Sequence, residues 1–272
     1  MQTWRLLLEY EGTRYHGWQE QKNSRTVAGE LRVAAEKALG HGVDIAGAGR
    51  TDAGVHASGQ VARLRSRKRA RPGELVRLLN DNLPADINVL AASEAQPSFD
   101  PRREATMRYY VYQVSTRRSA FAKRFVWWVR DELDLERMSG AAGSLKGRHD
   151  FRNFCEARED DKSTVVDVES VELVRSGDLI LFRVGAPRFL WKMVRRILGS
   201  LVEVGRGSLS VEQFESLIRA AIHTGRGVAM PKGFSVAART APPSGLFLER
   251  VVYGEKDAPR ELVPIIPVPG RP

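Results

Sequence analysis

The chain has 272 residues, 42% of them hydrophobic and 28% charged, which is a composition typical of a globular protein with one large core or two small ones. Lys and Arg number 43 against 33 Asp and Glu, and the resulting net charge of +10 favours a polyanionic partner, above all nucleic acid. No segment approaches the roughly 20 apolar residues of a membrane span, and residues 1–12 lack the features of a signal peptide. We therefore expect a cytoplasmic protein without membrane attachment, in which the single cysteine, Cys155, is a partly buried, unreactive thiol.

The first hundred residues predict the order strand, helix, strand, strand, helix, strand. Apolar side chains alternate at the start of the chain, as in a half-buried strand. Thr26 precedes a segment with helical apolar spacing that ends at Gly40, and Pro72 and Pro84 bound a second helix. The predicted strands are residues 3–10, 41–48, 55–65 and 86–95, and the predicted helices are residues 26–40 and 72–84.

The second half of the chain predicts the same order with insertions. Two copies of βαββαβ indicate an α+β protein with two ferredoxin-like halves, whose antiparallel sheets join side by side and leave a central active-site cleft. We assign residues 1–104 to the N-terminal half, residues 105–256 to the C-terminal half, and residues 257–272 to a proline-rich, extended tail. The predicted strands are residues 107–115, 124–130, 163–174, 178–185 and 245–253, and the predicted helices are residues 133–147, 187–205 and 210–225.

The sequence GAGRTDAG, Gly47 to Gly54, surrounds Arg50 and Asp52 with glycines. It lacks the GxxxxGK[ST] pattern of a phosphate-binding loop, and an alternating strand follows it instead of a helix. The histidines are scattered and the single cysteine rules out a multi-cysteine cluster, so we expect neither a metal nor a cofactor. The simplest alternative for this loop is a tight turn with both charges in solvent.

A long helix predicted at residues 187–205 sets Trp191, Arg195, Leu198 and Val202 on one face. Arg195 is therefore expected to be half buried, where a guanidinium needs an anion. Asp52 on its turn is a candidate partner. Arg195 could instead extend to solvent or pair with a nearby glutamate.

Several long motifs, in this order along the chain, resemble those of the TruA family of tRNA pseudouridine synthases. They are YEGTRYHGWQEQ, GAGRTDAGVHASGQVA, LNDNLPADINV, FDPRREATMRYYVY, GRHDFRNF, FLWKMVRRILGSLVEVG and APPSGLFLERVVYG. The resemblance implies an isomerase that modifies uridines at positions 38 to 40 of the tRNA anticodon stem-loop without a cofactor. It also implies a homodimer that binds tRNA across both subunits.

The same resemblance implies roles for four residues. Asp52 is then the catalytic aspartate, Arg50 helps to displace the target base, Tyr109 stacks on the uracil, and Arg195 pairs with the aspartate. Tyr109 is preferred to Tyr110 and Tyr112 because the family motif places the tyrosine directly after a basic residue, here Arg108. The reaction breaks the N1–C1′ bond, turns the uracil and rejoins it through C5. Asp52 would serve it either as a nucleophile at C1′ or as a base that gives a glycal.

Contacts with the RNA are expected from two further segments. A uridine in a folded stem must be flipped out, and Arg50 beside the loop could fill its place. His16 and Trp18 lie in a loop suited to RNA contact, although both could instead be packing residues. The basic run of residues 63–72 supplies a phosphate-contact surface or is simply a solvated strand end. The residues of this run that we assign to RNA binding are Arg63, Arg65, Arg67 and Lys68.

Two alternatives remain open for the function. One is a pseudouridine synthase that acts at another RNA site, and the other is a noncatalytic basic RNA-binding protein. The intact GRTDAG loop argues against the second, because a protein that only binds RNA gains nothing from a carboxylate that faces phosphates.

Overall fold

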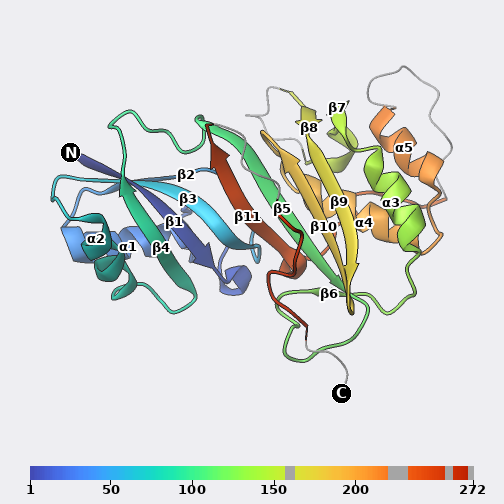
Figure 1. Ribbon diagram of the computed structural model, residues 1–272, viewed down its shortest axis with the longest axis horizontal. Coiled ribbons are helices and arrows are strands. Elements are labelled where there is room, and N and C mark those ends of the chain that lie inside the picture. Colours follow the sequence, from blue (N-terminus) through green and yellow to red (C-terminus); the bar gives the residue numbers. More distant parts are fainter. Residues whose placement is uncertain (157–162, 220–231, 255–259, 269–272) are drawn as a thin grey trace. The chain divides into compact units, whose positions relative to one another are not determined.

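The computed structural model describes residues 1–156, 163–219, 232–254 and 260–268, and these form an α+β protein with mainly antiparallel sheets (Figure 1). The chain divides into two units, Met1–Arg108 with Phe247–Ala258, and Tyr109–Leu246 with Pro259–Pro272. The last predicted strand therefore belongs mostly with the N-terminal half and not with residues 105–256. Phe247 explains this placement, because its ring stacks on that of buried His56 with a centroid distance of 4.8 Å.

The sheet of the first unit is built around its first strand, which pairs antiparallel with a strand on each side. Alternate residues of this strand, from Trp4 to Tyr10, are buried, as the apolar alternation predicts. The final strand pairs parallel with the third through Phe247 and Leu248. The strands are β1 (Gln2–Tyr10), β2 (Asp44–Gly47), β3 (His56–Ser66), β4 (Ile87–Glu94) and β11 (Leu246–Tyr253), in the order β4-β1-β3-β11 with β2 also on β3.

Two helices, α1 (Val27–Leu39) and α2 (Pro72–Asn80), pack against each other and against strands of this sheet (Figure 1). Thr26 caps α1 as predicted, because its hydroxyl oxygen accepts a hydrogen bond from the Gly29 N–H at 3.3 Å. Gly40 ends the helix with a φ of +85°, a conformation that glycine adopts without strain.

The second unit holds a three-stranded antiparallel arrangement and a separate two-stranded sheet. The predicted strand at residues 163–174 is two strands, because its first part pairs with residues 147–150, a strand that was not predicted and that begins at the last residue of the predicted helix. The predicted strand at residues 124–130 is only two residues long. The strands are β5 (Ala105–Ser115), β9 (Ser170–Ser176) and β10 (Leu179–Ala186), in the order β5-β10-β9, with β6 (Trp127–Trp128) on β5, and β7 (Gly147–Asp150) paired with β8 (Val165–Val168).

Three helices of the second unit pack together: α3 (Leu135–Gly143), α4 (Met193–Gly205) and α5 (Val211–Arg219). Helix α4 begins six residues later than predicted, because Lys192 has a left-handed backbone with a φ of +62°. The predicted end of the last helix, beyond residue 219, lies outside the described residues. Among the residues that are described, no helix combines the length and apolar character needed to cross a membrane.

The sequence predicted that residues 257–272 form an extended tail. Residues 260–268 instead pack against the second unit. Leu262 is 9% exposed and packs in an apolar cluster with Val111 and Leu181. The side chain of Gln113 holds the backbone of the same segment. Its oxygen accepts from the N–H groups of Ile265 at 2.7 Å and Ile266 at 3.2 Å, and its nitrogen donates to the Ile266 carbonyl at 3.1 Å. Apolar residues between the prolines thus make this segment part of the second unit's core.

Candidate active site

The loop between β2 and β3 that carries Arg50 and Asp52 is fixed at its start by hydrogen bonds to the backbone. The Ala48 N–H donates to the Val61 carbonyl at 2.8 Å, and the Ala48 carbonyl accepts from the buried Arg108 guanidinium at 2.8 and 3.2 Å. The Gly49 carbonyl accepts from the buried Gln60 amide at 2.9 Å. Charged and amide donors therefore satisfy the carbonyls of two consecutive loop residues.

The centre of the loop is held through Thr51. Its hydroxyl is 2.8 Å from that of Tyr10, and its carbonyl accepts from the Trp18 N–H at 3.1 Å. Burial raises the pKa of Tyr10 to about 12, so its phenol stays protonated at neutral pH and acts as a hydrogen-bonding anchor. The turn is closed by a hydrogen bond of 3.1 Å from the Val55 N–H to the Asp52 carbonyl.

Residues 15–18 pack directly against this loop. Gly17 has a φ of +90°, and a Cβ added to it would lie 2.4 Å from the Thr51 carbonyl oxygen and 3.1 Å from the Asp52 carbonyl carbon. The Gly54 N–H donates to the Tyr15 carbonyl at 3.2 Å. Only glycine allows the two backbones to approach so closely.

The two charged side chains of the loop extend from this fixed backbone. Arg50 is exposed and Asp52 is partly buried. The loop thus presents a guanidinium and a carboxylate from one rigid turn. A turn with no function would not require this many buried polar anchors, each of which needs its own partner.

The two residues expected to contact RNA beside the loop differ in exposure. His16 is exposed, whereas Trp18 is only 3% exposed. The Trp18 indole lies against Gly47, because a Cβ added to Gly47 would be 2.4 Å from the indole Nε1. The ring centroids of Trp18 and Tyr10 are 6.2 Å apart. This packing under the loop favours the alternative reading of Trp18 as a supporting residue, and it leaves His16 available for RNA.

In the second unit, Tyr109 is partly buried on β5, and its ring covers Gly185 of β10. A Cβ on Gly185 would lie 2.6 Å from Cε1 and 2.9 Å from Cδ1 of Tyr109. The neighbouring Tyr110 and Tyr112 are 7% and 0% exposed, so both are core residues. Gly185 thus sets the position of the tyrosine, a role that was not predicted from the sequence. A glycine inside a strand pattern, which often marks a close approach, was the available signal.

Arg195 lies in the first turn of α4 and is partly buried, as the helical spacing predicted. Its Nε donates to the Ala241 carbonyl at 2.7 Å, and the Ala241 N–H donates to the Arg195 carbonyl at 3.0 Å. Burial raises the pKa of Tyr112 well above its usual value, while the positive charge of Arg195 opposes this shift. Trp191 lies before the start of the helix, so the predicted face begins at Arg195.

The first part of the basic run is held by internal partners. Arg63 forms an ion pair with Asp44 at 2.8 Å and donates to the Phe99 carbonyl at 3.1 Å. Arg65 lies 3.7 Å from the same carboxylate and donates to the Pro97 carbonyl. Both arginines lie within β3, where register places them opposite β2, and these contacts favour a structural role.

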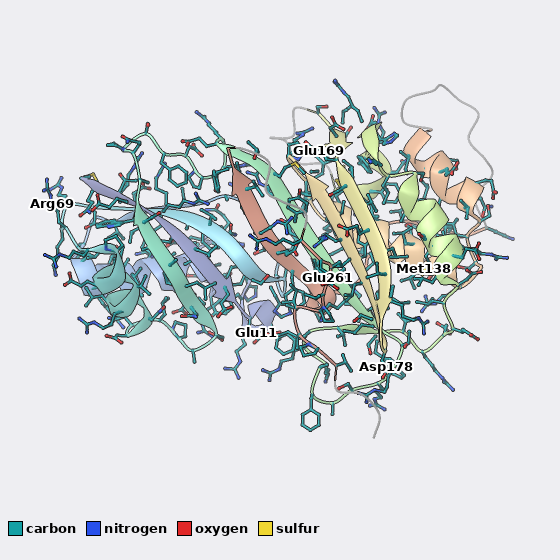
Figure 2. The ribbon with its side chains drawn as sticks, in the orientation of Figure 1. Glu11, Arg69, Met138, Glu169, Asp178 and Glu261 are labelled. Atoms are coloured by element: carbon teal, nitrogen blue, oxygen red, sulfur yellow. The ribbon has the colours of Figure 1, made fainter. Side chains whose placement is uncertain are left out.

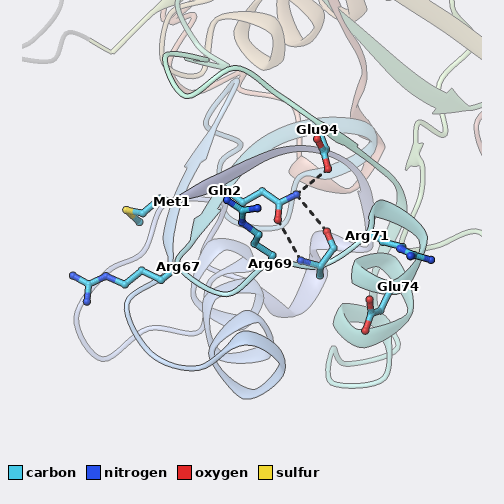
Figure 3. A pocket seen from close by; sticks show the side chains of 8 residues that line it. Met1, Gln2, Arg67, Arg69, Arg71, Glu74 and Glu94 are labelled. Carbon is cyan, nitrogen blue, oxygen red and sulfur yellow. Dashed lines mark hydrogen bonds between the residues drawn. The ribbon is translucent and has the colours of Figure 1, made fainter.

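The cationic residues of the basic run that follow the end of β3 are exposed. They lie at the opposite end of this strand from the Asp52 loop. Arg67 and Lys68 are exposed, although the Lys68 ammonium also donates to the Ala38 carbonyl at 3.2 Å. A pocket of about 660 Å³ opens here (Figure 3). The side chains that line it include Gln2, Arg67, Arg69, Arg71, Glu74 and Glu94.

The described residues contain no group of three or more His, Cys, Asp and Glu side chains arranged to hold a metal ion. Each unit contributes a different set of candidate residues. The first unit brings Arg50, Asp52 and His16 to one loop cluster, and the second carries Tyr109 and Arg195.

A family model described as tRNA pseudouridine synthase matches residues 7–102 and 141–254 of this chain. A protein of Myxococcus xanthus named tRNA pseudouridine synthase A is 41% identical over 263 residues, which cover 96% of this chain and 94% of that protein. Proteins of the same name from Agrobacterium fabrum and Dictyoglomus turgidum are 36% and 37% identical. These matches cover 96% and 93% of this chain, and 96% and 100% of the two relatives.

Proposed function

This chain belongs to the tRNA pseudouridine synthase family and isomerises uridine in tRNA, and we propose that its targets lie at positions 38 to 40 of the anticodon stem-loop, with Asp52 as the catalytic carboxylate. The observation that carries the role of Asp52 is the loop itself. Arg108 and Gln60 anchor its backbone, Tyr10 holds the side chain of Thr51, and Asp52 extends from the turn. A fixed carboxylate needs little reorganisation when the reaction begins.

The chemistry of the reaction determines what the Asp52 carboxylate must do. The N1–C1′ bond breaks, the uracil turns, a C5–C1′ bond forms, and the proton on C5 leaves. Asp52 would act either by bonding to C1′ and later leaving, or by removing a sugar proton that is returned when the new bond forms. In both routes it must be ionised and close to the sugar, and a nearby guanidinium favours the ionised form.

We assign the accompanying roles to residues of both units. Arg50, exposed next to Asp52, takes the place of the flipped nucleotide in the stem. Tyr109 stacks on the detached uracil, and Arg195 supplies positive charge for Asp52. His16 contacts the RNA next to the loop. The βαββαβ order and the β4-β1-β3-β2 pairing of the first unit support a ferredoxin-like half, and we extend this assignment to the second. We further propose a homodimer that acts in the cytoplasm.

The target position is tested with tRNA transcripts labelled with tritium at C5 of uridine, because the isomerisation releases this hydrogen to water. A transcript with uridines at positions 38 to 40 should release label, and a matched transcript with cytidines at these three positions should release none. Equal release from both would move the target to another part of the tRNA, which is the first alternative drawn from the sequence.

Replacing Arg67, Arg69 and Arg71 together with glutamine should weaken tRNA binding and lower the slope of log Kd against log salt by about 1 for each phosphate that the variant no longer neutralises. The three side chains line the pocket beyond the end of β3 (Figure 3). Filter binding between about 50 and 200 mM salt measures the slope. Replacing exposed Arg77, Arg137 and Arg175 removes the same charge and is the control. An identical slope for the two triple variants would place the phosphate contacts elsewhere.

Gly185→Ala should reduce kcat/KM by roughly 10-fold or more, because the new methyl group would collide with the Ser170 hydroxyl and with the Tyr109 ring, and so displace the ring from its place over Gly185. Steady-state tritium release measures the effect. Gly140→Ala is the control, since nothing lies within 4 Å of a Cβ at this position of α3. Full activity of Gly185→Ala with an unshifted melting temperature would show that the ring position is not critical.

A further inference from the structure

The segment that follows β5 presents an aromatic side chain to solvent. Phe121 is 89% exposed, far more than the other large apolar residues of the described chain. Isolated exposed apolar residues are common on protein surfaces, so the exposure alone carries no argument. The charge and the rigidity of the surrounding segment give it significance.

Residues 116–130 contain five cationic side chains and no Asp or Glu. Arg117 forms an ion pair at 2.9 Å with Asp178, which lies in the turn between β9 and β10 and is labelled in Figure 2. Arg118 and Lys123, which flank Phe121 in the sequence, are exposed. The Arg118 guanidinium carbon lies 5.6 Å from the ring centroid of Trp128, a second exposed aromatic residue. The segment thus combines exposed aromatic rings with cations.

The backbone that carries Phe121 is held in place. The next residue, Ala122, is 2% exposed and belongs to the apolar cluster of the second unit. Its N–H donates to the Ser119 hydroxyl at 3.2 Å, and its carbonyl accepts from the Phe125 N–H at 2.8 Å. Thr116 donates to the Asp178 carbonyl through its N–H at 2.9 Å and through its hydroxyl at 3.1 Å. A buried residue directly after Phe121 therefore keeps the ring directed outward.

We propose that Phe121 is a stacking platform for an unpaired base of the tRNA substrate, with Arg118 and Lys123 binding the flanking phosphates. The proposal rests on the function proposed above, and it extends the RNA contact surface to a segment outside the family motifs quoted from the sequence. Every base has a face that stacks on an aromatic ring, and cations next to the ring attract the phosphates of the same strand.

The positive charge of this segment favours RNA over a second copy of the chain as its partner. A twofold-symmetric contact centred on Phe121 would bring Arg118 and Lys123 of the two copies toward each other, and Asp178, the carboxylate beside this segment, is already paired with Arg117. An RNA strand presents the opposite charge along its whole length. The segment therefore suits a polyanion better than itself.

The test measures tRNA binding in the Asp52→Asn background, so that no turnover complicates the binding curve and a failure of the proposed catalytic role does not affect the result. Phe121→Ala should raise the Kd for unmodified tRNA by about 5- to 100-fold, the range that corresponds to the loss of one stacked base. Phe121→Trp should restore the affinity, and Phe121→Leu should restore little of it. Val263→Ala, which shortens a 53% exposed apolar side chain of the same unit, should leave the Kd unchanged.

Light scattering on the same samples separates RNA stacking from self-association. The proposal expects the same molar mass for wild type and Phe121→Ala. A smaller molar mass for Phe121→Ala, or equal Kd values for the alanine and tryptophan variants, would overturn it. The first result would assign Phe121 to an interface between copies of the chain.

Discussion

Asp52→Asn is expected to abolish pseudouridine formation, with a loss of at least roughly 10³-fold in the single-turnover rate, while the Kd for tRNA changes by less than about twofold. Asparagine has nearly the same shape as aspartate, so the anchored loop backbone should be retained. The amide, however, neither attacks C1′ nor removes a sugar proton efficiently. Tritium release under single-turnover conditions and filter binding give the two quantities separately.

The control for this variant is Asp81→Asn, which neutralises an exposed carboxylate at the end of α2. It should leave both the rate and the Kd unchanged. A rate for Asp52→Asn within 10-fold of wild type would contradict the catalytic role. A rate and an affinity that fall together would instead make Asp52 a binding residue, as the noncatalytic alternative would require.

Gly17→Ala is expected to lower the free energy of unfolding by roughly 3 kcal/mol or more and to reduce kcat/KM by at least about 10-fold. Two effects combine at this position. The φ of +90° is unfavourable for alanine, and the new methyl group would collide with the carbonyl groups of Thr51 and Asp52. The backbone of the Asp52 loop must move to relieve this contact. Denaturant unfolding and tritium release measure the two consequences.

Gly42→Ala separates the two effects, because Gly42 has a φ of +85° but nothing within 4 Å of an added Cβ. The free energy of unfolding of Gly42→Ala should fall by only about 1 kcal/mol and the activity should be retained, because this variant has nearly the same backbone strain as Gly17→Ala but no collision. Equal losses of stability for Gly17→Ala and Gly42→Ala would mean that the loop accommodates the methyl group. The account of residues 15–18 as a rigid support for the loop would then be wrong.

Local patterns in the sequence predicted most of the elements but not their partners. Alternation identified β1, and Thr26 and Gly40 marked the ends of α1, because these signals act within a few residues. The split of residues 163–174 into β8 and β9 depends on pairing with β7, a strand that the sequence did not predict. The packing of residues 260–268 depends on Gln113, about 150 positions away in the chain. Such contacts leave no periodic pattern in the segment itself.

The charged residues of the candidate site were predictable because a carboxylate in a glycine-rich turn stands out in the sequence. Their supports were not. Gln60 and Arg108 anchor the loop from β3 and β5, and their distance along the sequence hides this role. The basic run was also ambiguous, since only the end of β3 at Ser66 separates the internally paired Arg65 from the exposed Arg67.

The most direct test of the central claim is to map pseudouridine in unmodified tRNA transcripts by carbodiimide labelling and primer extension after incubation with the purified protein. The account predicts stops in the anticodon arm, at positions 38 to 40, with the wild type and none with Asp52→Asn. Stops at these positions with both proteins would contradict the role of Asp52, and stops only in another part of the tRNA would contradict the proposed target.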